Sequence, residues 1–156
     1  MRIGIIGAGI SGLALGAALH RHGIDVQIYE RHPRVRSGGA GITLAPNGLA
    51  ALDALGIGAG FRELQENQVP LQGGLRRPQG NWLTNIPAEI TKASLALDRS
   101  ELHALLLEDI PGARIHTSAD SVHVDAGSGV VSFADGSQEQ FDVVIGADGI
   151  RSSVRR

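Results

Sequence analysis

The chain has 156 residues, of which 42% are hydrophobic and 19% are charged, a composition typical of a globular protein with one core. Its net charge of -2 argues against nucleic acid as a partner and against a polybasic membrane-binding patch. It contains no cysteine, which excludes disulfides, thiolate catalysis and cysteine-ligated metals and predicts a reducing, cytoplasmic compartment. The apolar N-terminus is too short and too rich in glycine for a signal peptide or a membrane span.

The N-terminal segment predicts a strand, a glycine turn, a helix and a second strand. Residues 2–6 form an apolar run typical of a buried parallel strand, and residues 25–29 alternate as a second strand. Between them, residues 7–12 have the pattern G-x-G-x-x-G. Residues 13–19 are rich in alanine and leucine, which favours a closely packed helix, and Gly23 ends it.

Each glycine of the turn has a physical task. Gly7 permits the tight turn, Gly9 lets a pyrophosphate approach the backbone, and Gly12 lets the helix press against the sheet. The helix N-terminus adds unpaired N–H groups and the positive end of its dipole. In this context the turn predicts a dinucleotide site. The alternative is a glycine-rich turn between strand and helix in another class of α/β protein.

Glu30 follows the second strand and lies 18 residues beyond Gly12. A carboxylate at this position can accept hydrogen bonds from both ribose hydroxyls, whereas it would repel a 2′-phosphate. Glu30 therefore favours the adenosine of NAD or FAD over that of NADP, although the neighbouring Arg31 keeps NADP open.

The middle of the chain departs from this regular pattern. Residues 31–41 predict a basic, glycine-rich loop, residues 42–45 a strand, and residues 46–55 an amphipathic helix with leucines facing the core. Residues 71–77 and 82–86 then predict two strands joined by a turn, a β excursion from the α/β pattern that would reach toward a substrate side.

The last part of the chain predicts the return to the sheet. Asp98 is a candidate N-cap for a helix that runs to Glu108. Residues 113–117 and 142–146 predict further parallel strands, and residues 121–141 predict an antiparallel meander between them. The whole pattern predicts a three-layer α/β dinucleotide-binding domain with a parallel sheet and a β-meander crossover.

Four separated stretches also match one family. The chain resembles the N-terminal half of the single-component (class A) flavoprotein aromatic hydroxylases, the FAD-dependent monooxygenases of the salicylate hydroxylase and para-hydroxybenzoate hydroxylase type. The matching motifs, in family order and over nearly the entire chain, are Gly7-x-Gly9-x-x-Gly12 with Glu30-Arg31, Gly39-Ala40-Gly41-Ile42-x-Leu44-x-Pro46-Asn47, Asp98-Arg99-x-x-Leu102-x-x-x-Leu106, and Gly146-Ala147-Asp148-Gly149-x-x-Ser152-x-Val154-Arg155.

The resemblance implies roles for the residues of the first two motifs. Glu30 and Arg31 would bind the adenosine ribose and its surroundings, and Gly41 and Ile42 would lie beside the isoalloxazine ring. The turn that would hold the FAD pyrophosphate consists of Gly7, Ala8, Gly9, Ile10, Ser11 and Gly12.

The later motifs complete the implied cofactor site. Arg99 would reach the pyrophosphate and ribityl chain, and Val122 would contact adenine through its backbone. Asp148, Gly149 and Arg155 belong to a motif that the family uses for both FAD and the nicotinamide. The alternatives are a surface ion pair for Arg99 and a plain turn for Asp148 and Gly149.

The resemblance implies a Rossmann-like FAD-binding domain that is incomplete at its C-terminus. The family reduces FAD with NADH or NADPH and uses oxygen to hydroxylate an aromatic or similar small substrate. The family's second Gly-Asp motif and its substrate domain do not appear before Arg156, and the chain offers no catalytic base for the substrate. We therefore expect weak FAD binding at most and no hydroxylation from this chain alone, with the missing half or a second copy of the chain as a partner.

Two other function classes remain open. One is an NAD-dependent dehydrogenase or a flavin oxidoreductase that is not an oxygenase, and the other is a non-catalytic nucleotide-binding half-protein that needs a partner chain. The six histidines have no metal-ligand spacing such as H-E-x-x-H, so the sequence predicts solvated or hydrogen-bonded histidines and no metal site.

Overall fold

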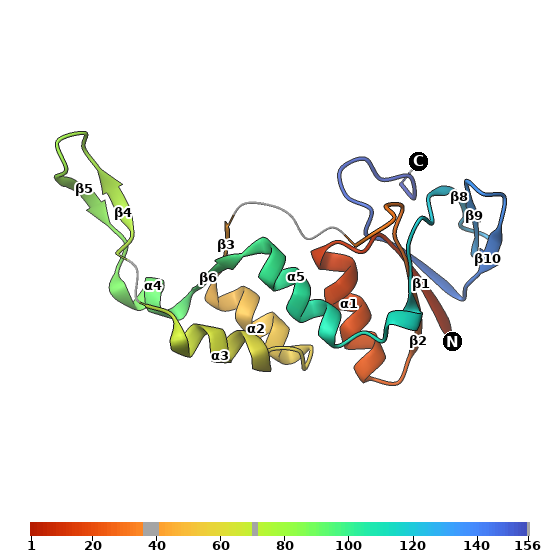
Figure 1. The fold of residues 1–156 in the computed structure, drawn as a ribbon, viewed down its shortest axis with the longest axis horizontal. Helices are drawn as coiled ribbons and strands as arrows, with labels where there is room; N and C mark the ends of the chain where they lie inside the picture. Colours follow the sequence, from red (N-terminus) through yellow and green to blue (C-terminus); the bar gives the residue numbers. More distant parts are fainter. Residues whose placement is uncertain (36–40, 70–71, 156) are drawn as a thin grey trace. The chain divides into compact units, whose positions relative to one another are not determined.

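A computed structural model describes residues 1–35, 41–69 and 72–155 and divides the chain into two compact units (Figure 1). The first unit combines Met1–Gly39 with Arg99–Arg156, and the second unit is Ala40–Asp98. The second unit is therefore inserted into the sequence of the first. Parts of the predicted basic loop and of the first hairpin strand lie outside the described residues.

The first unit contains a parallel sheet, two α-helices and a β-meander. Its elements, in chain order, are β1 (Arg2–Ile6), α1 (Ile10–Arg21), β2 (Asp25–Tyr29), α5 (Arg99–Glu108), the 3₁₀ helix η1 (Gly112–Arg114), β7 (Ile115–His116), β8 (Ser121–Asp125), β9 (Val130–Phe133), β10 (Gln138–Gln140) and β11 (Val143–Gly146).

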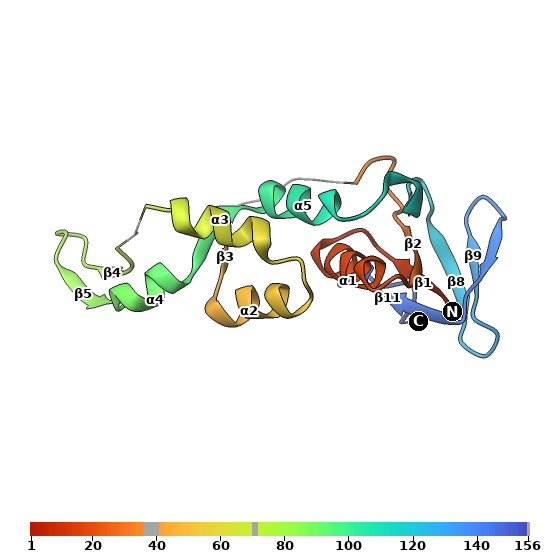
Figure 2. The ribbon, with the colours of Figure 1, turned by 90° about the horizontal axis from the view of Figure 1, so that it is seen from below.

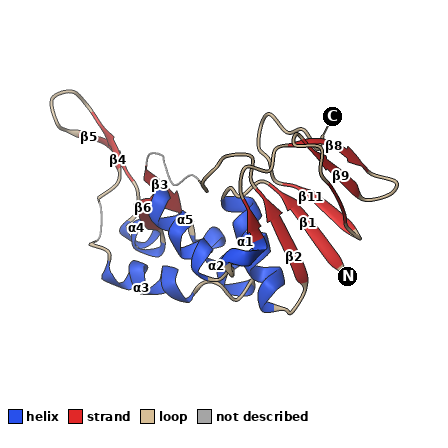
Figure 3. Ribbon diagram, turned by 45° about the vertical axis from the view of Figure 1, so that its right-hand side comes forward, coloured by secondary structure: helices blue, strands red, loops and turns tan. Residues whose placement is uncertain are grey.

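The four strands of the main sheet are parallel and lie in the order β11-β1-β2-β7. The predicted parallel sheet is confirmed. Figures 2 and 3 show α1 on one side of this sheet and the meander on the other, which gives the three predicted layers. The apolar run of β1 is buried because both faces of the strand are covered.

An aromatic cluster joins the meander to the sheet. The ring of Tyr29 packs against Phe133 and Phe141, with centroid distances of 4.8 and 5.7 Å. Ile6 and Val131 complete the buried cluster. Burial raises the pKa of Tyr29 to about 12. The cluster therefore fixes the meander where its first strand, β8, approaches the ends of β1 and β2.

The second unit has a two-stranded antiparallel sheet covered by helices, and a hairpin. Its elements are β3 (Gly41–Leu44), α2 (Pro46–Ala54), α3 (Ala59–Asn67), β4 (Gly74–Arg76), β5 (Trp82–Asn85), α4 (Ala88–Ala93) and β6 (Leu95–Asp98). β3 pairs with β6, and the buried side chains of this unit include Leu95 of β6, Leu49 of α2 and Phe61 of α3. The predicted hairpin is present as β4 and β5, with the Arg76 guanidinium stacked 3.9 Å from the Trp82 ring.

The prediction for one strand needs correction, and three elements of the structure were not predicted. The strand predicted over residues 113–117 is only Ile115–His116, because η1 occupies the preceding turn, where the Arg114 N–H donates to the Pro111 carbonyl. The helices α3 and α4 were not predicted: they are short, and none of the α4 side chains is buried. The segment that forms β6 was not predicted as a strand, and its pairing with β3 is a contact distant in sequence.

Candidate functional site

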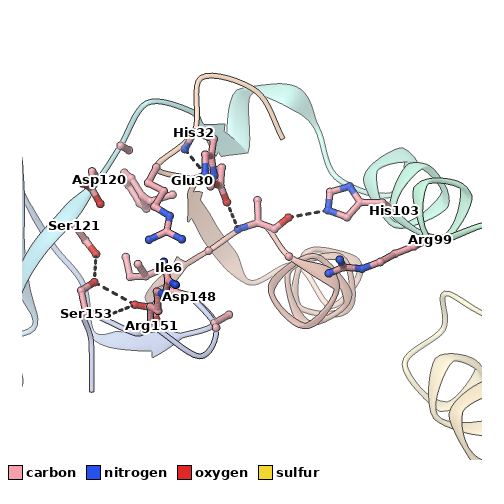
Figure 4. A pocket seen from close by; sticks show the side chains of 18 residues that line it. Ile6, Glu30, His32, Arg99, His103, Asp120, Ser121, Asp148, Arg151 and Ser153 are labelled. Atoms are coloured by element: carbon pink, nitrogen blue, oxygen red, sulfur yellow. Dashed lines mark hydrogen bonds and ion pairs between the residues drawn. The ribbon is translucent and has the colours of Figure 1, made fainter. Parts of the chain in front are cut away.

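A cavity of about 540 Å³ lies at the carboxyl ends of β1, β2 and β11 in the first unit (Figure 4). Its volume is in the range of small-molecule sites. The ends of parallel strands meet at one edge of a sheet, which brings distant residues together there. The residues that line the cavity are Ile6, Gly7, Ala8, Gly9, Tyr29, Glu30, Arg31, His32, Arg99, His103, Ala119, Asp120, Ser121, Ala147, Asp148, Gly149, Arg151 and Ser153.

The glycine turn forms the floor of this cavity and leads into α1. Gly7 has a φ of 109°, a backbone conformation that favours glycine. A Cβ atom on Gly12 would clash with the Gly7 carbonyl oxygen and meet the Ala147 side chain at 3.3 Å. The close packing predicted at Gly12 is therefore confirmed.

Gly9 differs from the other two glycines of the turn because it faces open space. A Cβ atom on Gly9 would meet no described atom within 4 Å. Gly9 is also the N-cap of α1, and the first turn of that helix, all of it described, contains no acidic residue. The helix N-terminus therefore offers unpaired N–H groups and a positive dipole end to an anion beside Gly9.

The Glu30 carboxylate links the end of β2 to the glycine turn. Its Oε2 accepts a hydrogen bond from the Ala8 N–H at 3.0 Å, and its Oε1 accepts one from the His32 N–H at 3.0 Å. The His32 ring lies 2.5 Å from the same Oε1. Burial raises the pKa of Glu30, but the hydrogen bonds from His32 and Ala8 outweigh burial, so the net shift is downward. An ionised carboxylate has about four acceptor positions, and these contacts occupy up to three of them, so Glu30 retains capacity for one ligand hydroxyl.

Asp148 organises the turn after β11. Its Oδ2 accepts hydrogen bonds from the Ser153 N–H at 2.6 Å, the Ser153 hydroxyl at 3.1 Å and the Val154 N–H at 3.3 Å. Burial raises the pKa of Asp148. The hydrogen bonds from the Ser152 side chain and from the Val154 and Ser153 N–H groups lower this pKa by more, so the net shift is downward. Its buried Oδ1 has no hydrogen-bond partner in the described part of the chain.

A serine pair connects this turn to the meander. The hydroxyl oxygens of Ser153 and Ser121 lie 3.1 Å apart, and Ser121 is buried at the start of β8. Ser121 begins the β-meander, whereas Ser153 lies after β11, the strand that follows the meander. The Ser121–Ser153 pair thus joins two walls of the cavity that are distant in sequence. Figure 4 shows this pair beside Asp148, while Arg99 and His103 project from α5 on the other side of the turn.

Eight residues predicted from the sequence line the cavity together: Gly7, Ala8, Gly9, Glu30, Arg31, Arg99, Asp148 and Gly149. Ile10, Ser11 and Gly12 are not among the described lining residues; they follow Gly9 directly, in the first turn of α1. Val122 is on β8 with 57% of its surface exposed, and Arg155 donates to the Ile150 carbonyl; neither is among the described lining residues. Gly41 and Ile42 belong to the second unit, where they pair with Asp98 and Leu97.

Several lining residues were not named from the sequence. The polar ones are His32, His103, Asp120, Ser121, Arg151 and Ser153. One signal was available for His103, because it follows Arg99 by four residues and therefore shares its face of α5. Asp120, Ser121 and Ser153 are brought in by contacts distant in sequence, which local patterns do not reveal.

The described residues 1–35, 41–69 and 72–155 contain no group of three His, Asp or Glu side chains that could hold a metal ion. Within the same residues, no helix has the length and apolar character needed to cross a membrane. The charged groups that do meet in the cavity are arginines and carboxylates, beside the N-terminus of α1. This arrangement suits a ligand that carries both phosphates and hydroxyls.

Comparison with known proteins agrees with this chemistry. Two relatives are each 40% identical to the chain: 2-heptyl-3-hydroxy-4(1H)-quinolone synthase of Pseudomonas aeruginosa, with 100% of this chain and 42% of the relative aligned, and the FAD-dependent monooxygenase pytG of Aspergillus terreus, with 99% and 49% aligned. Among solved structures, 2-methyl-3-hydroxypyridine-5-carboxylic acid oxygenase in its tetrameric form has a TM-score of 0.82 and 26% identity, over 99% of this chain and 41% of its own.

These proteins are longer than this chain, which spans about two fifths to half of their length. The family model described as "FAD binding domain" matches residues 1–156, the whole chain. Its match agrees with the dinucleotide site that the glycine turn predicted. The chain therefore belongs to the FAD binding domain family.

Proposed function

We propose that this chain is the FAD-binding part of a flavin-dependent monooxygenase that uses NADH or NADPH and oxygen to hydroxylate an aromatic or similar small substrate. The observation that carries the proposal is the cavity of the first unit, where the glycine turn, Glu30, Arg99 and Asp148 meet. The names of the relatives support an oxygenase. The chain spans less than half of most of them, so the activity belongs to a longer protein or assembly.

The residues of the cavity fit FAD. The open space beside Gly9 and the N-terminus of α1 would take the pyrophosphate, and the planar, permanently charged guanidinium of Arg99 would pair with it. Glu30 and Arg31 would face the adenosine ribose. Bound FAD would supply the hydride acceptance and oxygen chemistry that no side chain can provide.

The remaining predicted contacts complete the proposed site. The backbone of Val122 would meet adenine, and Gly41 and Ile42 would lie beside the isoalloxazine ring. Asp148 and Gly149 would form the wall of the cavity on the flavin side, with Arg155 in the same segment. The work of this chain is to bind and orient the cofactor, while residues of the longer protein would complete the substrate pocket.

We also propose a cytoplasmic location, supported by the absence of cysteine, and a homo-oligomer or the remaining half of the enzyme as partner.

Gly9 provides a test of where FAD binds. Alanine at this position would place a methyl group in the space proposed for the pyrophosphate, at a φ of -78° that alanine tolerates. We expect Gly9→Ala to weaken FAD binding by about tenfold to a hundredfold, the loss expected when hydrogen bonds to a charged group are broken. Flavin fluorescence titration measures this change.

The control for this experiment is a measurement of the folding stability of Gly9→Ala itself. Because the added methyl group contacts nothing, the free energy of unfolding of Gly9→Ala should stay within about 1 kcal/mol of the parent value, the cost of alanine at a helix N-cap. Unchanged FAD affinity in this variant would place the cofactor elsewhere and contradict the proposed site.

A further inference from the structure

We propose that His103 is a positioning residue for the phosphate-binding turn: its Nε2 holds the Ala8 carbonyl and thereby fixes the peptide between Ala8 and Gly9. The proposal rests on the proposed function, because the turn matters for FAD only if the cavity binds FAD. None of the sequence motifs assigned this histidine a role.

His103 is placed for this task by the packing of α5 on α1. Only 4% of its surface is exposed, and its Nε2 lies 2.9 Å from the Ala8 carbonyl oxygen, 95 residues away in sequence (Figure 4). Its helix neighbours Leu102 and Leu106 are each 1% exposed and anchor α5 in the core. The hydrogen bond is therefore held from a rigid element.

The partner of Nε2 determines which ring nitrogen carries the proton. A carbonyl oxygen can only accept a hydrogen bond, so Nε2 must be the N–H donor. Nδ1 is buried and has no hydrogen-bond partner in the described part of the chain. A proton on Nδ1 would be a buried donor without a partner, so the geometry assigns the ring proton to Nε2.

This hydrogen bond controls a segment that would otherwise be poorly constrained. Ala8 stands between Gly7 and Gly9, and glycine permits many backbone conformations. The Ala8 N–H is held by the Glu30 carboxylate at 3.0 Å, and its carbonyl is held by His103. Because a trans peptide is planar, fixing the Ala8 carbonyl toward α5 directs the Gly9 N–H to the opposite side. Glu30 and His103 thus set the two peptide groups on either side of Ala8.

A pair of variants separates this role from simple packing. The side-chain amide of glutamine can donate from nearly the position of Nε2, so His103→Gln should keep FAD affinity within about threefold of the parent. His103→Leu fills similar space without a donor and should weaken FAD binding by about tenfold, the loss expected for one buried hydrogen bond. Ile110→Val is the control in the same core: it removes one buried methylene group and should lower the melting temperature while FAD affinity stays within threefold.

The proposal is overturned if His103→Leu binds FAD as tightly as the parent, or if His103→Gln binds as weakly as His103→Leu. A second measurement does not require FAD. Nitrogen-15 NMR of the imidazole rings, with the His103 signals assigned by their loss in His103→Gln, should show the proton on Nε2. A proton on Nδ1 alone would contradict the hydrogen bond from His103 Nε2 to the Ala8 carbonyl. If the parent chain binds no FAD, the proposed function fails, and the NMR result still decides whether His103 holds the turn.

Discussion

Gly12→Ala is expected to lower the free energy of unfolding by about 3 kcal/mol, the upper range for forced overpacking of a core. The physical reason is the clash between the new Cβ atom and the Gly7 carbonyl oxygen, with Ala147 3.3 Å away on the same side. Backbone cannot move aside as a flexible side chain can, so the helix must shift from the sheet. Urea unfolding followed by circular dichroism measures the loss.

Gly48→Ala is the matched control, because Gly48 also lies within a helix, α2, but a Cβ atom there would meet nothing within 4 Å. Alanine is the better helix former by about 1 kcal/mol, so this variant should be as stable as the parent or slightly more stable. A Gly12→Ala chain that unfolds at the parent's urea concentration would show that α1 does not pack as closely as described.

The second large effect is expected at Asp148. Asp148→Ala removes the acceptor for the Ser153 and Val154 N–H groups and for the Ser153 hydroxyl, and it should destabilise the first unit by about 3 kcal/mol, since hydrogen bonds to a charged group contribute roughly 1.5–3 kcal/mol each. FAD affinity should fall as well, because the turn after β11 lines the cavity. Asp109→Ala is the control: it removes only a partly exposed ion pair with Arg21, worth about 0–1 kcal/mol.

The pH dependence of this effect follows from the lowered pKa of Asp148. A carboxyl whose pKa is lower in the folded state contributes stability above its unfolded pKa of about 3.9, and that stability is lost as the pH falls through the folded value. Asp148→Asn has no such group. The stability difference between the parent and Asp148→Asn should therefore be constant near neutral pH and shrink below about pH 4. A difference that grows on acidification would contradict the lowered pKa.

Local sequence patterns predicted the elements that build the dinucleotide site. The strands of residues 2–6 and 25–29, the glycine turn and the following helix are found where periodicity and glycine spacing placed them. These features are local: an apolar run, a turn that requires glycine, and a helix rich in alanine and leucine each depend on residues close in sequence. The Asp148-Gly149 turn after β11 was also recognised, because its residues are contiguous.

Other parts of the site depend on contacts that no local pattern reports. His103 resembles any histidine of an amphipathic helix until α5 is packed on α1 and its ring meets Ala8. Ser121 and Ser153 become a pair only when the meander folds back on the sheet. The strand predicted over residues 113–117 was too long for a different, local reason: the Arg114 N–H donates to the Pro111 carbonyl, and this turn takes the first predicted residues into η1.

The measurement that tests the central claim most directly is the titration of the purified 156-residue chain with FAD and, separately, with NAD, followed by the visible flavin spectrum and by protein fluorescence. The account predicts a perturbed flavin spectrum and FAD binding at least tenfold tighter than NAD binding, because the cavity would hold the pyrophosphate and ribose of FAD and its flavin-side contacts. Binding of NAD as tight as that of FAD, or binding of neither, would contradict it.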